Sequence, residues 1–69
     1  MNRNSRYYPL DHLVEVRFPV CPGWEAVAAF NLCPLAEWYA RECKRLEPEN
    51  TYRVVERLKR GTYLTRVEV

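Results

Sequence analysis

The chain has 69 residues, of which 48% are hydrophobic and 13% aromatic. This length predicts one domain, and the apolar content is high enough for a folded core, which disfavours a disordered chain. The 11 basic and nine acidic residues leave a net charge of only +2, so a strong electrostatic preference must come from local clustering. We expect a flexible N-terminal arm over 1–9 and a single α+β domain over 10–69.

The apolar runs and the cysteine spacing indicate neither a membrane span nor a paired cysteine motif. No apolar run approaches the roughly 18 residues of a membrane span, and no leader opens the chain, so we expect a cytoplasmic protein. The three cysteines, Cys21, Cys33 and Cys43, form no C-x-x-C pair. This pattern favours buried or partly buried thiols, with a disulfide, or a zinc site that includes His12, as the alternatives. We expect no cofactor.

The first predicted strand covers 13–18, where apolar and polar side chains alternate. Val14, Val16 and Phe18 share one face, which is typical of a half-buried strand. Two prolines and a glycine within 19–23 predict a turn after it.

The next segment, Trp24–Phe30, is ambiguous. Its alanines favour a helix that begins at Pro22, but Asn31 and Pro34 end the segment early and the preceding strand needs a partner. We therefore favour a strand. A strand would place four residues on one side: Trp24, Ala26, Ala28 and Phe30.

An amphipathic helix is predicted between Pro34 and Pro48. Proline suits the first turn of a helix, because its missing N–H has no intrahelical acceptor there. Glu37 and Arg41 have the i,i+4 spacing of an ion pair. The apolar spacing predicts that five residues form the buried stripe: Leu35, Trp38, Tyr39, Cys43 and Leu46.

Residues 51–58 and 62–69 are rich in β-branched and aromatic side chains and predict two further strands. Gly61 between them can adopt the positive φ that a tight hairpin requires. The predicted order is therefore β-β-α-β-β, an α+β fold with a single helix packed on one face of a small antiparallel sheet.

A single helix covers only one face of a sheet. Alternation predicts that the covered face takes Val14, Val16, Phe18, Tyr52, Val54, Tyr63 and Val67. The other face should be exposed and mostly basic, with Glu15, Arg17, Arg53, Val55, Arg57, Lys59, Leu64, Arg66 and Glu68.

This charged face has two interpretations. It is either a solvated surface that discourages aggregation or a docking surface for an acidic protein patch or a phosphate backbone. Nine of the 11 basic residues are arginines, whose planar guanidinium groups suit carboxylate and phosphate partners, and this favours recognition. The arm is either a frayed end or a second contact. The predicted partner-binding residues are Arg17, Arg53, Arg57, Lys59, Arg60 and Arg66, with Arg6 and Tyr7 of the arm.

Catalytic patterns are missing from the sequence. Ser5, Asp11 and His12 do not make a plausible triad, and a Cys–His pair of Cys21 with His12 lacks any orienting group. We expect that the protein is not an enzyme. Specific nucleic-acid binding is disfavoured, because most strand aromatics are predicted on the covered face, although a weak contact with nucleic acid remains an alternative.

Three segments carry a family resemblance: Trp24–Phe30 (WEAVAAF), Cys33–Ala40 (CPLAEWYA) and Thr51–Val55 (TYRVV). Together they resemble small stand-alone bacteriophage proteins, and some anti-CRISPR inhibitors share this size and helix-on-sheet build. The resemblance implies a protein that works by occupying a surface of a host complex.

The leading hypothesis is a non-enzymatic phage or mobile-element inhibitor in the cytoplasm of a host cell. It would bind a host protein or ribonucleoprotein complex and block it sterically, as a monomer or homodimer without membrane contact. A nucleic-acid-binding accessory protein and a self-assembling phage structural component are the alternatives.

Overall fold

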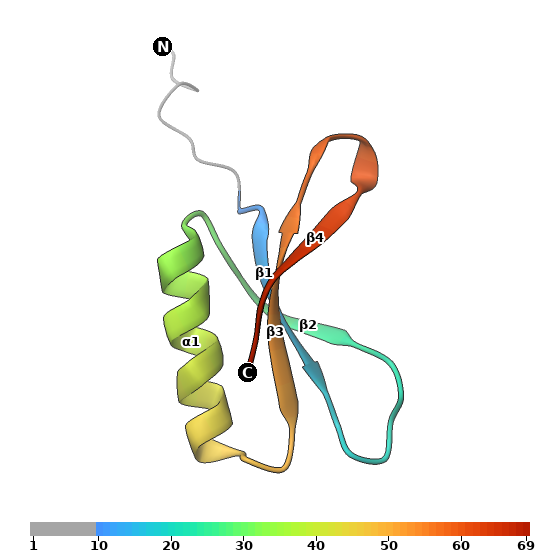
Figure 1. The fold of residues 1–69 in the computed structure, drawn as a ribbon, viewed down its shortest axis with the longest axis vertical. Helices are drawn as coiled ribbons and strands as arrows, with labels where there is room; N and C mark the ends of the chain where they lie inside the picture. Colours follow the sequence, from blue (N-terminus) through green and yellow to red (C-terminus); the bar gives the residue numbers. More distant parts are fainter. Residues whose placement is uncertain (1–9) are drawn as a thin grey trace.

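The computed structural model describes residues 10–69, apart from the side chain of Arg60, and shows one helix on one face of a four-stranded antiparallel sheet (Figure 1). The elements are β1 (His12–Arg17), β2 (Glu25–Phe30), α1 (Cys33–Leu46), β3 (Thr51–Arg57) and β4 (Tyr63–Glu68). This confirms the predicted order and the α+β fold. Across the sheet the strands run β2-β1-β3-β4, so β1 and β3 are central and β2 and β4 are the edges.

The two central strands follow the predicted alternation. They pair in an uninterrupted antiparallel register, with Val14 opposite Val54 and Val16 opposite Tyr52. These four side chains point toward α1 and are buried. Their neighbours along each strand point to the other face, because successive side chains of a strand alternate.

The helix faces the sheet with its small residues. Ala36 and Ala40 are fully buried against the sheet, with Tyr39 and Cys43 packed beside them. Alanine has almost no side chain, so the helix backbone can approach the strands closely. The predicted stripe is therefore correct for Tyr39 and Cys43 but wrong for its other three members, because Leu35, Trp38 and Leu46 are exposed.

Trp38 shows why the stripe differs. It lies two positions after Ala36 and two before Ala40, which is about 200° around the helix from each of them. A helix that packs through its alanines must therefore turn Trp38 to the opposite side, where the residue is 60% exposed. The expectation that Trp38 belongs to the core is wrong.

The second strand is confirmed over Glu25–Phe30, but it contains a β-bulge. Ala28 pairs with Val14, whereas Ala26 pairs with the next residue, Glu15, so Val27 is an extra residue in β2. Such a residue shifts the alternation by one position. Ala28 and Phe30 consequently pack on the helix side, while Ala26 lies on the opposite side of the sheet. The expectation that Trp24, Ala26, Ala28 and Phe30 share one side is therefore wrong.

A second bulge lies in β4, where Arg66 is the extra residue. Val67 pairs with Val54 on the helix side, but beyond the bulge Leu64 pairs with Glu56 and Tyr63 pairs with Arg57. Leu64 is therefore on the helix side and Tyr63 on the other, which reverses the prediction for both. Tyr63 is 55% exposed. Phe18, also predicted as covered, lies beyond the end of β1 and is exposed.

The connections agree with the sequence. Pro34 lies in the first turn of α1, and Arg41 donates a hydrogen bond of 2.7 Å to Glu37. At the other end of the helix, Lys44 Nζ donates to the backbone carbonyls of Pro48 and Asn50, at 2.8 and 2.7 Å. Gly61 has the predicted positive φ, at 78°.

Candidate docking surface

The candidate site is the face of the sheet that points away from α1, which we call the open face. The helix contacts the sheet from the opposite side (Figure 1). The strand registers assign the residues of the open face: Leu13, Glu15 and Arg17 from β1, Ala26 and Ala29 from β2, Thr51, Arg53, Val55 and Arg57 from β3, and Tyr63, Thr65 and Glu68 from β4. The expectation that Val55 is exposed on this face is wrong, because Val55 is only 2% exposed.

Trp24, which directly precedes β2, lies on this face among arginines. The guanidinium carbon of Arg53 is 4.0 Å from the centroid of a Trp24 ring, and that of Arg17 is 5.0 Å away. Both distances fall within the range of a cation–π interaction. The bulge in β2 makes this possible, because it shifts the alternation so that Ala26 and Trp24, rather than Glu25, point to the open face.

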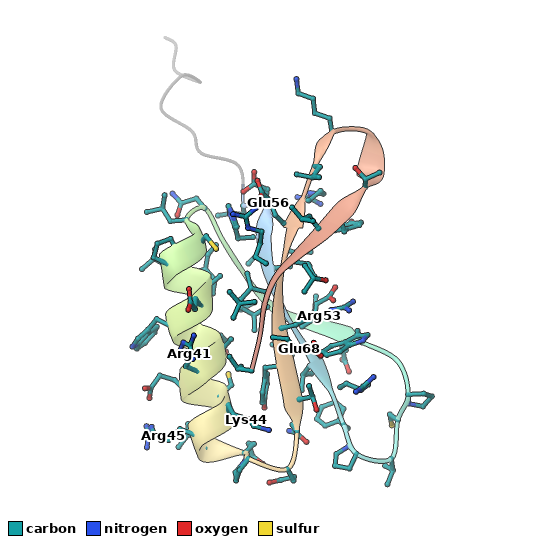
Figure 2. All side chains as sticks on the ribbon, viewed as in Figure 1. Arg41, Lys44, Arg45, Arg53, Glu56 and Glu68 are labelled. Atoms are coloured by element: carbon teal, nitrogen blue, oxygen red, sulfur yellow. The ribbon has the colours of Figure 1, made fainter. Side chains whose placement is uncertain are left out.

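Arg53 is also held by an ion pair. Its Nε group donates a hydrogen bond of 2.8 Å to Glu15 Oε1, its NH2 group lies 2.8 Å from the same oxygen, and the two side chains are only 27% and 17% exposed. Glu68 is opposite Arg53 in the register, and Figure 2 shows the two residues near one another beside β3. The charge of Arg53 is thus neutralised within the protein, while its guanidinium group contacts the ring of Trp24.

The remaining predicted site residues are divided between the ends of the open face. Arg17 lies next to Trp24 at the end of β1. Arg57 lies at the end of β3, where it donates a hydrogen bond to the Leu10 carbonyl at 3.4 Å, and Lys59 follows in the hairpin turn. Within 10–69, these three exposed cations form no ion pair. The structure therefore brings Arg17 and Arg53 together and separates Arg57 and Lys59 from them.

The predicted placement of Arg66 is wrong. Arg66 was expected on the open face, but the bulge in β4 turns it toward the helix side, where its NH1 group lies 3.6 Å from Glu56 Oε1. Arg6 and Tyr7 lie outside the described residues, as does the whole predicted arm. The described part of Arg60 is its backbone in the hairpin turn.

Glu56 belongs to a small charged cluster on the helix side, at the start of β1. His12 Nδ1 is 3.0 Å from Asp11 Oδ1, and His12 Nε2 is 4.0 Å from Glu56 Oε1. Cys21 follows the opposite end of β1, a strand whose six residues span about 20 Å, so Cys21 and His12 do not form the Cys–His pair that the sequence already disfavoured.

All three cysteines are free thiols, with Cys21 exposed and the two helical cysteines partly buried. Within the described residues, no group of three or more histidine, cysteine or acidic side chains is placed to hold a metal ion. No helix of this part of the chain is long and apolar enough to cross a membrane.

Sequence reasoning missed two features of the surface. It placed Trp38 in the core and Tyr63 under the helix, yet both are exposed aromatics. The stripe of Cys33, Ala36, Ala40 and Cys43, with helical spacing, was a signal for the true buried face of α1. No comparable signal marks the bulges.

Comparison with known proteins gives no match to any family model, to any curated protein or to any solved structure.

Proposed function

We propose that the protein is a small binding protein that docks through its open face on a partner protein and occupies a surface of that partner. The observation that carries the proposal is Trp24, which lies beneath the guanidinium groups of Arg17 and Arg53. Tryptophan and arginine are among the residues most enriched at the energetic centres of protein interfaces. Trp24 packs against an arginine that is itself fixed by an ion pair with Glu15, so the anchor loses less side-chain entropy when it binds.

The charges of the open face indicate the chemistry of the partner. Because Arg53 is paired with Glu15, the cations that remain for a partner are Arg17, Arg57 and Lys59. Such a surface suits an acidic patch that also offers an apolar contact to Trp24. In keeping with the resemblance to small phage proteins, the proposed partner is a host protein or ribonucleoprotein in the host cytoplasm, which the protein inhibits sterically.

The test compares two arginines with the same charge change. Arg17→Glu alters the open face, and Arg41→Glu is the control, because Arg41 is exposed on the helix at the other side of the molecule. Proteins captured from a host lysate with the wild-type chain are identified by mass spectrometry, and their affinities are then measured for all three chains.

We expect Arg17→Glu to weaken binding by on the order of tenfold or more, which is about 1.4 kcal/mol, and Arg41→Glu to bind as wild type does. Equal affinity for Arg17→Glu and the wild type contradicts the proposal. Arg53→Glu is unsuitable for this test, since it would place a third carboxylate beside Glu15 and Glu68 and destabilise the fold.

A second candidate function is supported by the placement of the aromatics. Trp24 and Tyr63 lie on the open face with Arg17 and Arg57, whereas the sequence predicted Tyr63 as covered. Exposed aromatics beside cations are how sheets bind single-stranded nucleic acid. A labelled oligonucleotide titrated at low salt tests this function. Binding that weakens steeply with salt and is lost in Trp24→Ala supports it, and no binding excludes it.

A further inference from the structure

The outer side of α1 carries a line of exposed apolar residues that the fold does not use. Leu35, Trp38 and Leu46 are 45%, 60% and 65% exposed, and Glu42 lies between them along the helix. The spacings from Leu35 to Trp38 and from Trp38 to Glu42 are three and four residues, which keeps these side chains along one side of a helix. We call Leu35, Trp38, Glu42 and Leu46 the outer helix stripe.

The charges beside the stripe are already paired within the helix. Arg45 NH2 lies 2.7 Å from Glu42 Oε1, and Arg41 NH2 lies 2.7 Å from Glu37 Oε2. Lys44 is turned to the side of α1 that faces β3, whereas Arg45 points to the outside (Figure 2). The stripe therefore has no net charge that a nucleic acid or an anionic membrane would complement. It suits a partner whose contact surface is also apolar and whose positive and negative side chains are also paired with one another.

A second copy of the same helix is such a partner. In an antiparallel pair whose two-fold axis crosses the outer side of α1 at the level of Ala40, Leu35 of each copy lies opposite Leu46 of the other. Trp38 of each copy then lies opposite Glu42 of the other, so an indole N–H faces a carboxylate, a donor with an acceptor. The stripe is thus complementary to itself in both halves of the pair, as a two-fold interface requires.

We propose that the protein forms a weak two-fold homodimer through the outer helix stripe, with the two α1 helices antiparallel. The 14-residue helix is about 21 Å long, so the contact is smaller than the roughly 800 Å² per partner of a standard stable interface. The dimer should therefore depend on concentration. The open face is on the opposite side of the sheet, so this proposal is independent of the proposed function.

The edges of the sheet offer the competing route to a dimer. Both edge strands contain a bulge, at Val27 in β2 and at Arg66 in β4. A bulge bends an edge and interrupts its row of free backbone groups, and it is one of the ways in which proteins prevent edge-to-edge pairing. The geometry thus favours a dimer that forms through the α1 helices over one that forms through the edge strands.

Sedimentation velocity over a range of protein concentrations tests the proposal. We expect the wild type to shift from monomer toward dimer as its concentration rises, and Trp38→Glu to remain monomeric, because it places two carboxylates opposite one another. Tyr63→Ser is the matched control, an exposed aromatic on the open face, and should dimerise as wild type does. Leu46→Glu provides a second variant on the stripe, and circular dichroism verifies that each variant is folded.

A mixture gives the most specific outcome. Trp38→Glu is monomeric alone, but mixed with Glu42→Lys it should form a one-to-one heterodimer, because its new carboxylate then lies opposite a lysine of the other chain. A wild type that stays monomeric up to about 1 mM overturns the proposal. A dimer that survives both Trp38→Glu and Leu46→Glu overturns it as well.

Discussion

Arg53 is the residue that connects the stability of the sheet to the candidate site. It contacts Glu15 through an ion pair of 2.8 Å and Trp24 through a ring contact of 4.0 Å. We expect a double-mutant cycle of Arg53→Ala with Trp24→Ala, measured by urea unfolding, to give a coupling of about 1 kcal/mol. Both the short distance and the limited exposure of Arg53 favour this value.

The same cycle with Arg17→Ala is the comparison for that measurement. Arg17 is exposed and its guanidinium lies 5.0 Å from the ring, so its coupling to Trp24 should be smaller. Equal coupling for both arginines, or none for Arg53, would show that Trp24 is not held as the structure indicates.

The sequence predicted part of this arrangement at the residue scale. Alternation correctly placed Glu15, Arg17 and Arg53 on one face, because β1 and β3 pair without a bulge. It did not predict that Arg53 is neutralised, since this depends on Glu15 being directly opposite it, and the register of two distant strands cannot be derived from either strand alone.

At the scale of the element, the helix offers the sharpest test of which face is buried. The side chain of Ala40 is fully buried where α1 packs on the sheet, so Ala40→Leu adds three carbon atoms where there is no space. We expect it to lower the free energy of unfolding by about 1–3 kcal/mol in urea denaturation.

Trp38→Ala on the same helix is the control for this prediction. Because Trp38 is 60% exposed, its loss should cost less than about 1 kcal/mol, whereas a core tryptophan would cost about 3–5 kcal/mol. A large loss for Trp38→Ala and a small one for Ala40→Leu would mean that the helix packs through its large residues, as the sequence pattern suggests.

The contrast between Ala40 and Trp38 shows which features of a helix or strand can be predicted from the sequence. The helix has two apolar sides, one of small and one of large residues, and hydrophobic spacing does not say which of them packs. Likewise the existence of β2 and β4 was predictable from composition, but Val27 and Arg66 as extra residues were not, because neither strand has a clear alternation in which a shift of one position would be visible.

At the scale of the whole molecule, the layers give the protein two different outer surfaces. The open face carries Trp24 with its arginines, and the outer helix stripe carries Trp38. The buried layer between them is thin and consists largely of valines and alanines. A dimer formed through the helices would therefore present two open faces to the outside and could bind a repetitive partner with increased avidity.

Hydrogen exchange tests this layered arrangement in one experiment. The central strands β1 and β3 are bonded on both sides, so their amides should exchange only on global unfolding, while in β2 and β4 the amides that point outward should exchange rapidly. Raising the protein concentration should leave these outward edge amides unprotected if the copies meet through α1. Protection that appears along β2 or β4 at high concentration would instead show a dimer built by joining sheet edges, because such a dimer bonds those very amides to the second copy.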